Sequence, residues 1–302
     1  MRAFVNLTYI DVIARAGSIR QAAEVLSITP SALNRRLLAV EDELEVQIFE
    51  RLPRGVRLNA AGEILIHHIR SQISDFERVK SQIADLSGVR RGHVTIACSQ
   101  ALLTAFLPAQ IALYRGEHPA VTFRVFPRDR MQAEGALSDF TAELALVFEP
   151  VRMVDFQTLI IVRQVVHAVM DRNHPLAGQP VLRLRDCLLH PLALPTATYG
   201  VRTLLDRAAA RINQDAVPTL ESDSFDFLCY ATRGSDLIAF QIDIGLPPDD
   251  ESGALVSRPI DPRDIADGML HLGQLRSRVL SVATERFASQ LSVSLADRYK
   301  VV

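Results

Sequence analysis

Cysteine is scarce in this sequence of 302 residues. The three that occur, Cys98, Cys187 and Cys229, are far apart, and their number is odd. This pattern argues against a disulfide framework, and it lacks the short spacings at which cysteines bind metals. We therefore expect three thiols in the protein core, with a redox-sensing pair as the less favoured alternative.

Long hydrophobic runs are absent as well. Asp11, Arg15 and Arg20 interrupt the first apolar segment, which is therefore not typical of a secretory signal. No uninterrupted apolar run approaches the roughly 20 residues that a membrane-spanning helix needs. We expect a cytoplasmic protein without a membrane partner.

Charge of one sign is not in excess either. The formal net charge is -2, which excludes a protein that binds nucleic acid through an overall positive surface. A hydrophobic content of 48% with 23% charged residues is typical of a globular protein. The length is sufficient for two domains.

Catalytic and metal-binding motifs are missing. The sequence contains no GxSxG, no nucleotide-binding glycine motif and no evident Ser/His/Asp order. His67 and His68 are adjacent on a predicted helix, so they point in different directions and do not form the i, i+4 pair that zinc needs. His174 precedes Pro175 in a predicted turn, where we expect it to hold the loop. We predict no catalytic site, no metal and no cofactor.

The most informative segment that is present runs from residue 18 to residue 62. Ser18 is followed three residues later by Gln21, a capping pattern that predicts a helix from about Ile19 to Leu26. Thr29 is a good N-cap and Pro30 suits the first position of a helix, so a second helix is predicted to begin at Pro30. Two short helices joined by a tight turn indicate a helix-turn-helix unit.

The second helix has an apolar stripe and a polar face. The stripe, with spacings of four and three, is predicted to be buried and consists of Leu33, Leu37, Val40 and Leu44. Ser31, Asn34 and Arg35 lie on other faces near the N-terminus of the helix. Such side chains can reach base edges and phosphates in the major groove. The alternative is an ordinary solvated helix, which the preceding short helix and turn make less favoured.

A basic hairpin follows this helix. The segment VQIFERLPRGVRL predicts two short strands with a bulged turn around Pro53, Arg54 and Gly55. Arginines along such a wing can contact phosphate or the minor groove. We therefore predict a winged helix-turn-helix domain over residues 1–58. Its candidate DNA-binding residues are Ser18, Arg20, Thr29, Pro30, Ser31, Asn34, Arg35, Arg36, Arg51, Arg54 and Arg57.

A long linker helix is predicted over residues 59–88, with Asn59 as its cap and Ser87 and Gly88 at its end. Its apolar residues follow a short heptad pattern, which favours pairing with a second subunit because such a stripe has little of its own chain to cover it. The candidate dimerisation residues are Ile66, Ile69, Ile73, Phe76 and Ile83. The alternative is packing on the wing and the following domain, which would use Val79 and Leu86.

Strands alternate with helices from residue 89 to residue 302. HVTIAC, VTFRVF and TAELALVF are predicted strands, as are VVHAVM, DLIAFQ and a return strand near HLGQL. A helical segment capped by Ser99 follows the first strand, and a closing helix is expected from about Val282 to Ala296. This order predicts a mostly parallel sheet with helices on both faces, in two lobes. Lobe I would contain residues of about 92–163 and 268–302, and lobe II those of about 164–267.

Polar residues at strand ends are the candidates for ligand binding. Ser99 and Gln100 lie at a strand-to-helix turn, where backbone N–H groups favour a carboxylate or another anion. Arg202, in a second polar cluster, can clamp a carboxylate with two hydrogen bonds. The alternatives are that Ser99 only caps a helix and that Arg202 is a solvated helix residue. The candidate effector-binding residues are Ser99, Gln100, Thr196, Thr198, Tyr199 and Arg202.

These segments together resemble the LysR-type transcriptional regulators. GSIRQAAEVLSITPSALNRRLLAVEDEL, IFER and GVRLNAAGE occur in the order of that family, and CSQ, DRNHPLAG, YGVR and TRGSDLIAF resemble its effector-binding domain. Phe140 stands where the family usually has glycine, and Glu143 where it usually has aspartate. The resemblance implies an α/β protein with an N-terminal winged helix-turn-helix, a long dimerising linker helix and a two-lobed effector domain similar to periplasmic solute-binding proteins.

The function implied by this resemblance is sequence-specific transcriptional regulation, controlled by a small-molecule effector bound between the two lobes. The expected partners are double-stranded DNA, an effector for which a carboxylate is the candidate, RNA polymerase, and further copies of the chain in a homodimer or homotetramer. The alternative is a cytoplasmic small-molecule receptor or an enzyme that uses the two-lobed domain. Because no catalytic constellation is visible, we expect the regulator.

Overall fold

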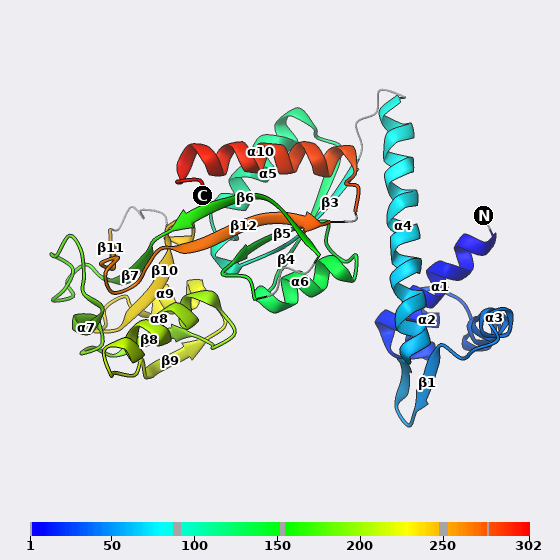
Figure 1. Ribbon diagram of the computed structural model, residues 1–302, viewed down its shortest axis with the longest axis horizontal. Helices are drawn as coiled ribbons and strands as arrows, with labels where there is room; N and C mark the ends of the chain where they lie inside the picture. Colours follow the sequence, from blue (N-terminus) through cyan, green and yellow to red (C-terminus); the bar gives the residue numbers. More distant parts are fainter. Residues whose placement is uncertain (1, 87–91, 152–154, 248–252, 277) are drawn as a thin grey trace. The chain divides into compact units, whose positions relative to one another are not determined.

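The computed structural model describes residues 2–86, 92–151, 155–247, 253–276 and 278–302 (Figure 1). The chain divides into two compact units, Met1–Ile83 and Ala84–Val302. Each unit has a hydrophobic core of its own. Among the helices that the structure describes, none is long and apolar enough to cross a membrane.

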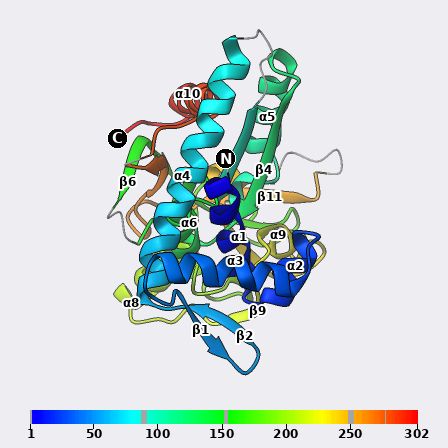
Figure 2. The ribbon, with the colours of Figure 1, turned by 90° about the vertical axis from the view of Figure 1, so that its right-hand side faces the viewer.

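The first unit combines helices with a two-stranded hairpin. Its elements are α1 (Arg2–Ala16), α2 (Ile19–Val25), α3 (Pro30–Glu43), β1 (Phe49–Leu52), β2 (Gly55–Leu58) and α4 (Ala60–Leu86). The hairpin projects from the N-terminal end of α4 in both ribbon views (Figures 1 and 2). Buried side chains from these elements form one core, which includes Ile10, Ile13, Ala22, Leu33, Leu37, Phe49, Ile66 and Ile69. The predicted winged helix-turn-helix fold is confirmed.

Local sequence signals placed α2 and α3 correctly. The Ser18 hydroxyl accepts a hydrogen bond from the Gln21 amide, and Thr29 does the same for the first turn of α3, which begins at Pro30. Leu33 and Leu37 are buried as predicted. The prediction for Leu44 is wrong: its side chain is 43% exposed because α3 ends at Glu43 and Leu44 is only the C-cap residue.

The wing differs from its prediction at the turn. β1 and β2 pair in continuous register from Phe49 opposite Leu58 to Leu52 opposite Gly55. Two residues therefore connect the strands, and the predicted bulge is absent from this hairpin. Glu41 fixes the hairpin to α3, because its Oε1 accepts a hydrogen bond of 2.8 Å from the Ile48 amide.

Helix α4 begins as predicted, because the Asn59 side chain accepts a hydrogen bond of 2.9 Å from the Gly62 amide. The predicted dimer contact of Ile66 and Ile69 is wrong, since both are buried in the core of their own unit. This half of α4 packs on α1, to which Arg70 is linked by a 2.8 Å ion pair with Asp11. The predicted helix end at residues 87–88 lies outside the described residues.

Lobe I of the second unit contains a five-stranded sheet in the order β4-β3-β5-β12-β6. Its strands are β3 (Gly92–Cys98), β4 (Val121–Pro127), β5 (Leu144–Phe148), β6 (Phe156–Gln164) and β12 (Gly268–Leu275); its helices are η1 (Gln100–Leu102), α5 (Phe106–Glu117), α6 (Arg130–Ser138) and α10 (Val282–Arg298). α10 packs on β3 and β6, and α6 packs on β5 and β12. Helices therefore cover both faces of the sheet.

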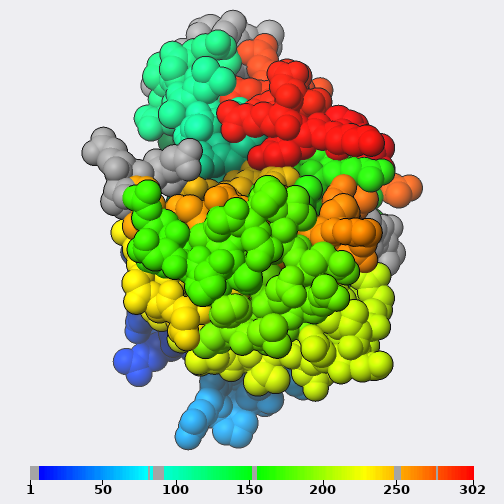
Figure 3. All heavy atoms as spheres, turned by 90° about the vertical axis from the view of Figure 1, so that its left-hand side faces the viewer, coloured from blue at the N-terminus to red at the C-terminus, as the bar shows by residue number. Residues whose placement is uncertain are grey.

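Lobe II contains a second five-stranded sheet, in the order β11-β7-β10-β8-β9. Its strands are β7 (Val166–Asp171), β8 (Leu192–Pro195), β9 (Pro218–Ser222), β10 (Ile238–Ile242) and β11 (Leu255–Pro259); its helices are α7 (Leu184–Cys187), α8 (Gly200–Arg211), α9 (Phe225–Ala231) and η2 (Asp243–Gly245). In the space-filling view, its yellow-green segments fill the lower part of the second unit, and red α10 of lobe I lies along the upper edge (Figure 3). The predicted two-lobed α/β fold is confirmed.

The sheets are less parallel than predicted. β3 is parallel to β4 and β5, but β12 is antiparallel to both of its neighbours, as is β7. The cause is the connectivity: the chain leaves lobe I through β6 and returns through β12, and these two strands pair side by side in opposite directions.

The predicted helix cap at Ser99 is wrong. The Ser99 side chain makes no capping hydrogen bond, and the α-helix begins only at Phe106.

The three cysteines are core thiols, as predicted. Cys98, Cys187 and Cys229 are all buried, and burial raises the pKa of each thiol to about 12. They therefore stay protonated at neutral pH, and a protonated thiol is a poor nucleophile. Within the described residues, no group of His, Cys, Asp and Glu side chains could hold a metal ion.

Candidate functional site

The N-terminal turn of α3 presents polar groups to solvent. Pro30, Ser31 and Arg35 are exposed, and Asn34 is half-buried. The Thr29 and Ser31 hydroxyl oxygens are 3.2 Å apart and form a hydrogen bond. The buried residues Leu33 and Leu37 hold another face of α3 against the core, so this turn stays open to solvent.

The arginines of the wing have different surroundings. Arg51 donates a hydrogen bond of 3.4 Å to the Asn34 side chain, which connects the wing to the polar face of α3. Arg57 forms a 2.7 Å ion pair with Glu50 across the hairpin. Arg54 lies in the exposed turn, at the tip of the wing.

The other candidate DNA-binding residues contact their own unit. Arg20 is 3.5 Å from Glu24 on the same helix, and the Arg36 guanidinium lies 4.9 Å from the centre of the Tyr9 ring. Ser18 uses its hydroxyl to cap α2. Of the wing arginines, the structure therefore brings Arg51 to the polar face of α3, whereas Ser18, Arg20 and Arg36 contact other residues of the same unit.

A second candidate site lies between the lobes of the second unit. It is lined by Ser99, Arg128, Asp129, Arg130, Val147 and Phe148 of lobe I and by Tyr199, Gly200, Val201 and Phe225 of lobe II. Its volume is about 10 Å³, which is at most the space of a single water molecule. This interlobe cleft is therefore closed in the structure.

Direct contacts hold the cleft closed. The Gln100 amide nitrogen donates a hydrogen bond of 3.0 Å to the Tyr199 hydroxyl oxygen, and the Thr104 hydroxyl donates one of 2.8 Å to Asp226. Gly200 permits the close approach at the start of α8, because a Cβ atom there would lie 2.9 Å from the Phe148 carbonyl oxygen. Burial, followed by the nearby charge of Asp223, raises the pKa of Tyr199, so its hydroxyl stays protonated.

The remaining candidate effector residues form a network inside lobe II. Arg202 donates hydrogen bonds of 2.8 Å to Asp206 and 3.0 Å to Glu221, so its guanidinium is occupied by protein carboxylates. The Thr196 hydroxyl donates to Asp223 and also lies 3.2 Å from that of Thr198. Ser99 and Tyr199 line the cleft and Gln100 contacts Tyr199, whereas this structure does not place Arg202 as a clamp for a ligand.

Comparisons with known proteins agree with this architecture. A family model described as "Bacterial regulatory helix-turn-helix protein, lysR family" matches residues 4–63, and one described as "LysR substrate binding domain" matches residues 87–295. This chain belongs to the LysR family of transcriptional regulators.

This LysR-type regulator is similar to known proteins over 70% of its length or more. An uncharacterized HTH-type transcriptional regulator of Escherichia coli strain K12, YbhD, is 30% identical over 70% of this chain, which spans 64% of that protein. Full-length CbnR in complex with its target DNA has a TM-score of 0.64 at 16% identity, over 96% of this chain and 99% of CbnR. The effector binding domain of QuiR in complex with shikimate has a TM-score of 0.60 at 17% identity, over 70% of this chain and all of that domain.

Sequence reasoning missed the basic residues of the cleft in this LysR-type regulator. Arg128 and Arg130 come directly after β4, and Asp129 between them caps α6 by accepting a 2.8 Å hydrogen bond from the Gln132 amide. The segment PRDR at the end of a predicted strand was a usable signal, because ligands of such folds bind beyond the carboxyl ends of strands. Its position beside Ser99 follows only from the pairing of β3 with β4.

Proposed function

We propose that this LysR-type regulator reads double-stranded DNA with the first turn of α3 and with the wing. The supporting observation is that Ser31 and Arg35 are exposed at the start of α3, on the side that Asn34 links to Arg51. Arginine is well suited to a bidentate hydrogen bond with guanine in the major groove. Arg54, at the wing tip, would contact phosphate.

Two arginine variants test these roles. If Arg35 reads a base, Arg35→Ala should weaken binding to the preferred site by about 1–3 kcal/mol and leave binding to random DNA nearly unchanged. Arg54→Ala should weaken binding to all sequences alike. It should also reduce the slope of the logarithm of the binding constant against the logarithm of the salt concentration by about 1, as expected for the loss of one phosphate contact. Titrations of both DNAs at several salt concentrations provide the measurement. Equal loss on specific and random DNA for Arg35→Ala would remove the base-reading role.

We also propose that the effector is a small anion, with a carboxylate as the candidate, bound in the interlobe cleft. Arg128 and Arg130 supply positive charge from lobe I. The N-termini of α6 and α8 point backbone N–H groups toward the same space, since Arg130 and Gly200 begin these helices. QuiR, a structural neighbour, is recorded in complex with shikimate.

Regulation then requires the cleft to open. A space of about 10 Å³ does not admit a metabolite, so the effector must bind an arrangement in which the contacts of Gln100 with Tyr199 and of Thr104 with Asp226 are broken. A ligand that binds this open arrangement more tightly shifts the population toward it.

The protein would act as a homodimer or homotetramer, with RNA polymerase as a further partner at promoters. Phe76, Val79 and Ile83 are all at least 40% exposed on α4, at spacings of three and four. These spacings place them on one face, suited to a second copy of the helix. Ile73, half-buried against the core, lies one turn earlier on this face.

Selection of DNA from a random library with the purified full chain tests the function as a whole. It should enrich an interrupted inverted repeat, as expected for two reading domains related by a two-fold axis. The selection is then repeated in the presence of each of a panel of small carboxylates. A carboxylate of the effector class should change how strongly the repeat is enriched. Absence of enrichment with folded protein would favour the receptor or enzyme alternative.

A further inference from the structure

The two walls of the interlobe cleft differ in hydrogen-bonding character. Both hydrogen bonds that hold the cleft closed have their donor on lobe I and their acceptor on lobe II: Gln100 donates to Tyr199 over 3.0 Å, and Thr104 donates to Asp226 over 2.8 Å. When the cleft opens, these four groups lose their partners. A ligand that takes over both contacts accepts hydrogen bonds from lobe I and donates them to lobe II.

Lobe I adds positive charge to its wall. Arg128 and Arg130 line the cleft, and each donates a hydrogen bond to a main-chain carbonyl oxygen of lobe I. Neither takes part in an ion pair within the described residues. The carboxylates on this side, Asp129 and Glu149, each accept a 2.8 Å hydrogen bond from a main-chain amide instead. Guanidinium N–H groups are therefore available for a carboxylate of a ligand.

Lobe II adds negative charge to the opposite wall. Asp226 faces lobe I as the acceptor of a hydrogen bond across the cleft, and Asp223 accepts one from the Thr196 hydroxyl. After burial, the charge of Asp223 is the largest cause that raises the pKa of Tyr199, which lines the cleft. Both carboxylates are exposed, and no ion pair among the described side chains includes either of them. The Arg202 guanidinium of this lobe binds two other carboxylates.

Apolar side chains complete the lining of the cleft. Val147 and Phe148 come from lobe I, and Val201 and Phe225 come from lobe II. All four are at most 4% exposed. The Phe225 ring also meets the Tyr199 ring edge-on, with 5.2 Å between the ring centroids. A ligand with an apolar body gains hydrophobic free energy if it covers any part of this surface that opening exposes to water.

We propose that the effector of the interlobe cleft is an α-amino acid with an apolar side chain. Its carboxylate accepts hydrogen bonds from Arg128 and Arg130, and its ammonium group donates hydrogen bonds to Asp223 and Asp226. The inference rests on the anion proposed above for this cleft and adds a cationic group to it. The two walls meet at hydrogen-bond distance in the closed cleft, so a small opening suits a ligand whose two charges are adjacent.

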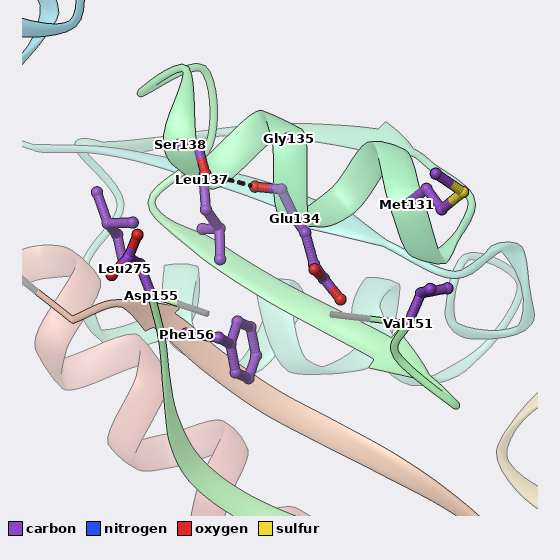
Figure 4. Close-up of a pocket in the computed structure, with 9 residues that line it drawn as sticks. All are labelled: Met131, Glu134, Gly135, Leu137, Ser138, Val151, Asp155, Phe156 and Leu275. Atoms are coloured by element: carbon purple, nitrogen blue, oxygen red, sulfur yellow. Dashed lines mark hydrogen bonds between the residues drawn. The ribbon is translucent and has the colours of Figure 1, made fainter. Parts of the chain in front are cut away.

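A larger cavity, of about 270 Å³, is the competing place for a ligand (Figure 4). It lies beside α6, where Leu137 points toward the Phe156 ring in the close-up. Its described lining residues belong to lobe I only, so a ligand there would not bridge the two lobes through them. Gly135 lines this cavity, and a Cβ atom built on it meets no other atom within 4 Å. Gly135→Leu therefore fills the cavity and serves as the control variant.

The probes are L-leucine, 4-methylpentanoate and 3-methylbutylamine. The second lacks the amino group of leucine, and the third lacks its carboxylate. Saturation-transfer NMR with the full chain at neutral pH should show binding of leucine and at least tenfold weaker binding of both analogues. Because the proposed site lies in the cleft, Gly135→Leu should bind leucine as tightly as the unchanged protein does.

Single substitutions assign each charge of the ligand to one wall. Asp223→Asn and Asp226→Asn should each weaken binding of leucine about tenfold, as expected for loss of a charge-assisted hydrogen bond, and leave binding of 4-methylpentanoate unchanged. Asparagine keeps an acceptor for the hydroxyl group that each aspartate binds. Arg128→Gln should weaken binding of leucine and of 4-methylpentanoate alike, by about tenfold. Thermal melts establish that the variants are folded.

The pattern of affinities separates failure of this proposal from failure of the anion site itself. Equal affinities for leucine and 4-methylpentanoate would remove the ammonium contacts and leave the proposed anion site in place. Equal affinities for leucine and 3-methylbutylamine would remove the anion site as well. Loss of leucine binding in folded Gly135→Leu would place the ligand in the lobe I cavity. No binding of L-leucine or L-phenylalanine up to about 10 mM, which corresponds to roughly −3 kcal/mol, would exclude this ligand class.

Discussion

Replacement of Gly55 by alanine tests how the wing is attached to the reading domain. Gly55 has a φ of +136°, in a region that side chains with a Cβ atom avoid. A Cβ atom at this position would overlap the carbonyl oxygen of Gly17, which itself has a φ of +62° in the turn between α1 and α2. That oxygen accepts a hydrogen bond of 2.8 Å from the Val56 amide. Gly55→Ala must therefore move the wing away from this turn.

The magnitude follows from two contributions. The unfavourable φ costs about 1–3 kcal/mol, and loss of the hydrogen bond between Val56 and Gly17 costs about 1 kcal/mol. We expect the hairpin to lose about 2–4 kcal/mol of local stability, which corresponds to roughly 30-fold to 1000-fold faster exchange of its amide hydrogens. Displacement of Arg54 should also weaken binding to all DNA sequences, by about tenfold.

Hydrogen exchange followed by mass spectrometry on the full chain is the appropriate assay, because it reports the hairpin separately from the second unit. Peptides covering residues 48–58 should exchange faster in Gly55→Ala, and peptides covering β3 and β4 should not change. Gly116→Ala is the control, since open space surrounds that position and alanine should stabilise α5 by about 0.5–1 kcal/mol. Unchanged exchange in the hairpin of Gly55→Ala would refute the close contact with Gly17.

Two further predictions concern the second unit. Tyr199→Phe removes the acceptor of the Gln100 amide and should weaken closure of the lobes by about 1 kcal/mol, so amides of η1 should exchange about fivefold faster; an unchanged rate would show that this contact does not hold the cleft. Burial lowers the pKa of His271 below its usual 6.5, so the unfolded chain binds a proton there more readily than the folded chain does. Above about pH 6.5 His271 is neutral in both states and does not affect the free energy of unfolding. As the pH falls below this value, the unfolded chain binds the proton first, so the folded state loses stability. His271→Leu should therefore reduce the loss of melting temperature between pH 7.5 and pH 5.

The sequence predicted those features that depend on neighbouring residues. Thr29 and Pro30 determine where α3 begins, because the cap and the missing N–H act within one turn of helix. The apolar spacing of Leu33 and Leu37 identifies the buried face of the same helix. The same kind of evidence identified six strands of the second unit, but it missed the short strand β8 and the edge strands β6, β9 and β11.

Features that depend on distant partners were not predictable in the same way. Periodicity showed that Ile66 and Ile69 lie on an apolar face, but it did not show that other elements of the same unit cover that face. The interactions of Arg202 with Asp206 and Glu221 depend on packing of α8 beside β9. Arg128 reaches the cleft only because β4 is the neighbour of β3. In each case the sequence did not reveal which distant part of the chain packs against the side chain.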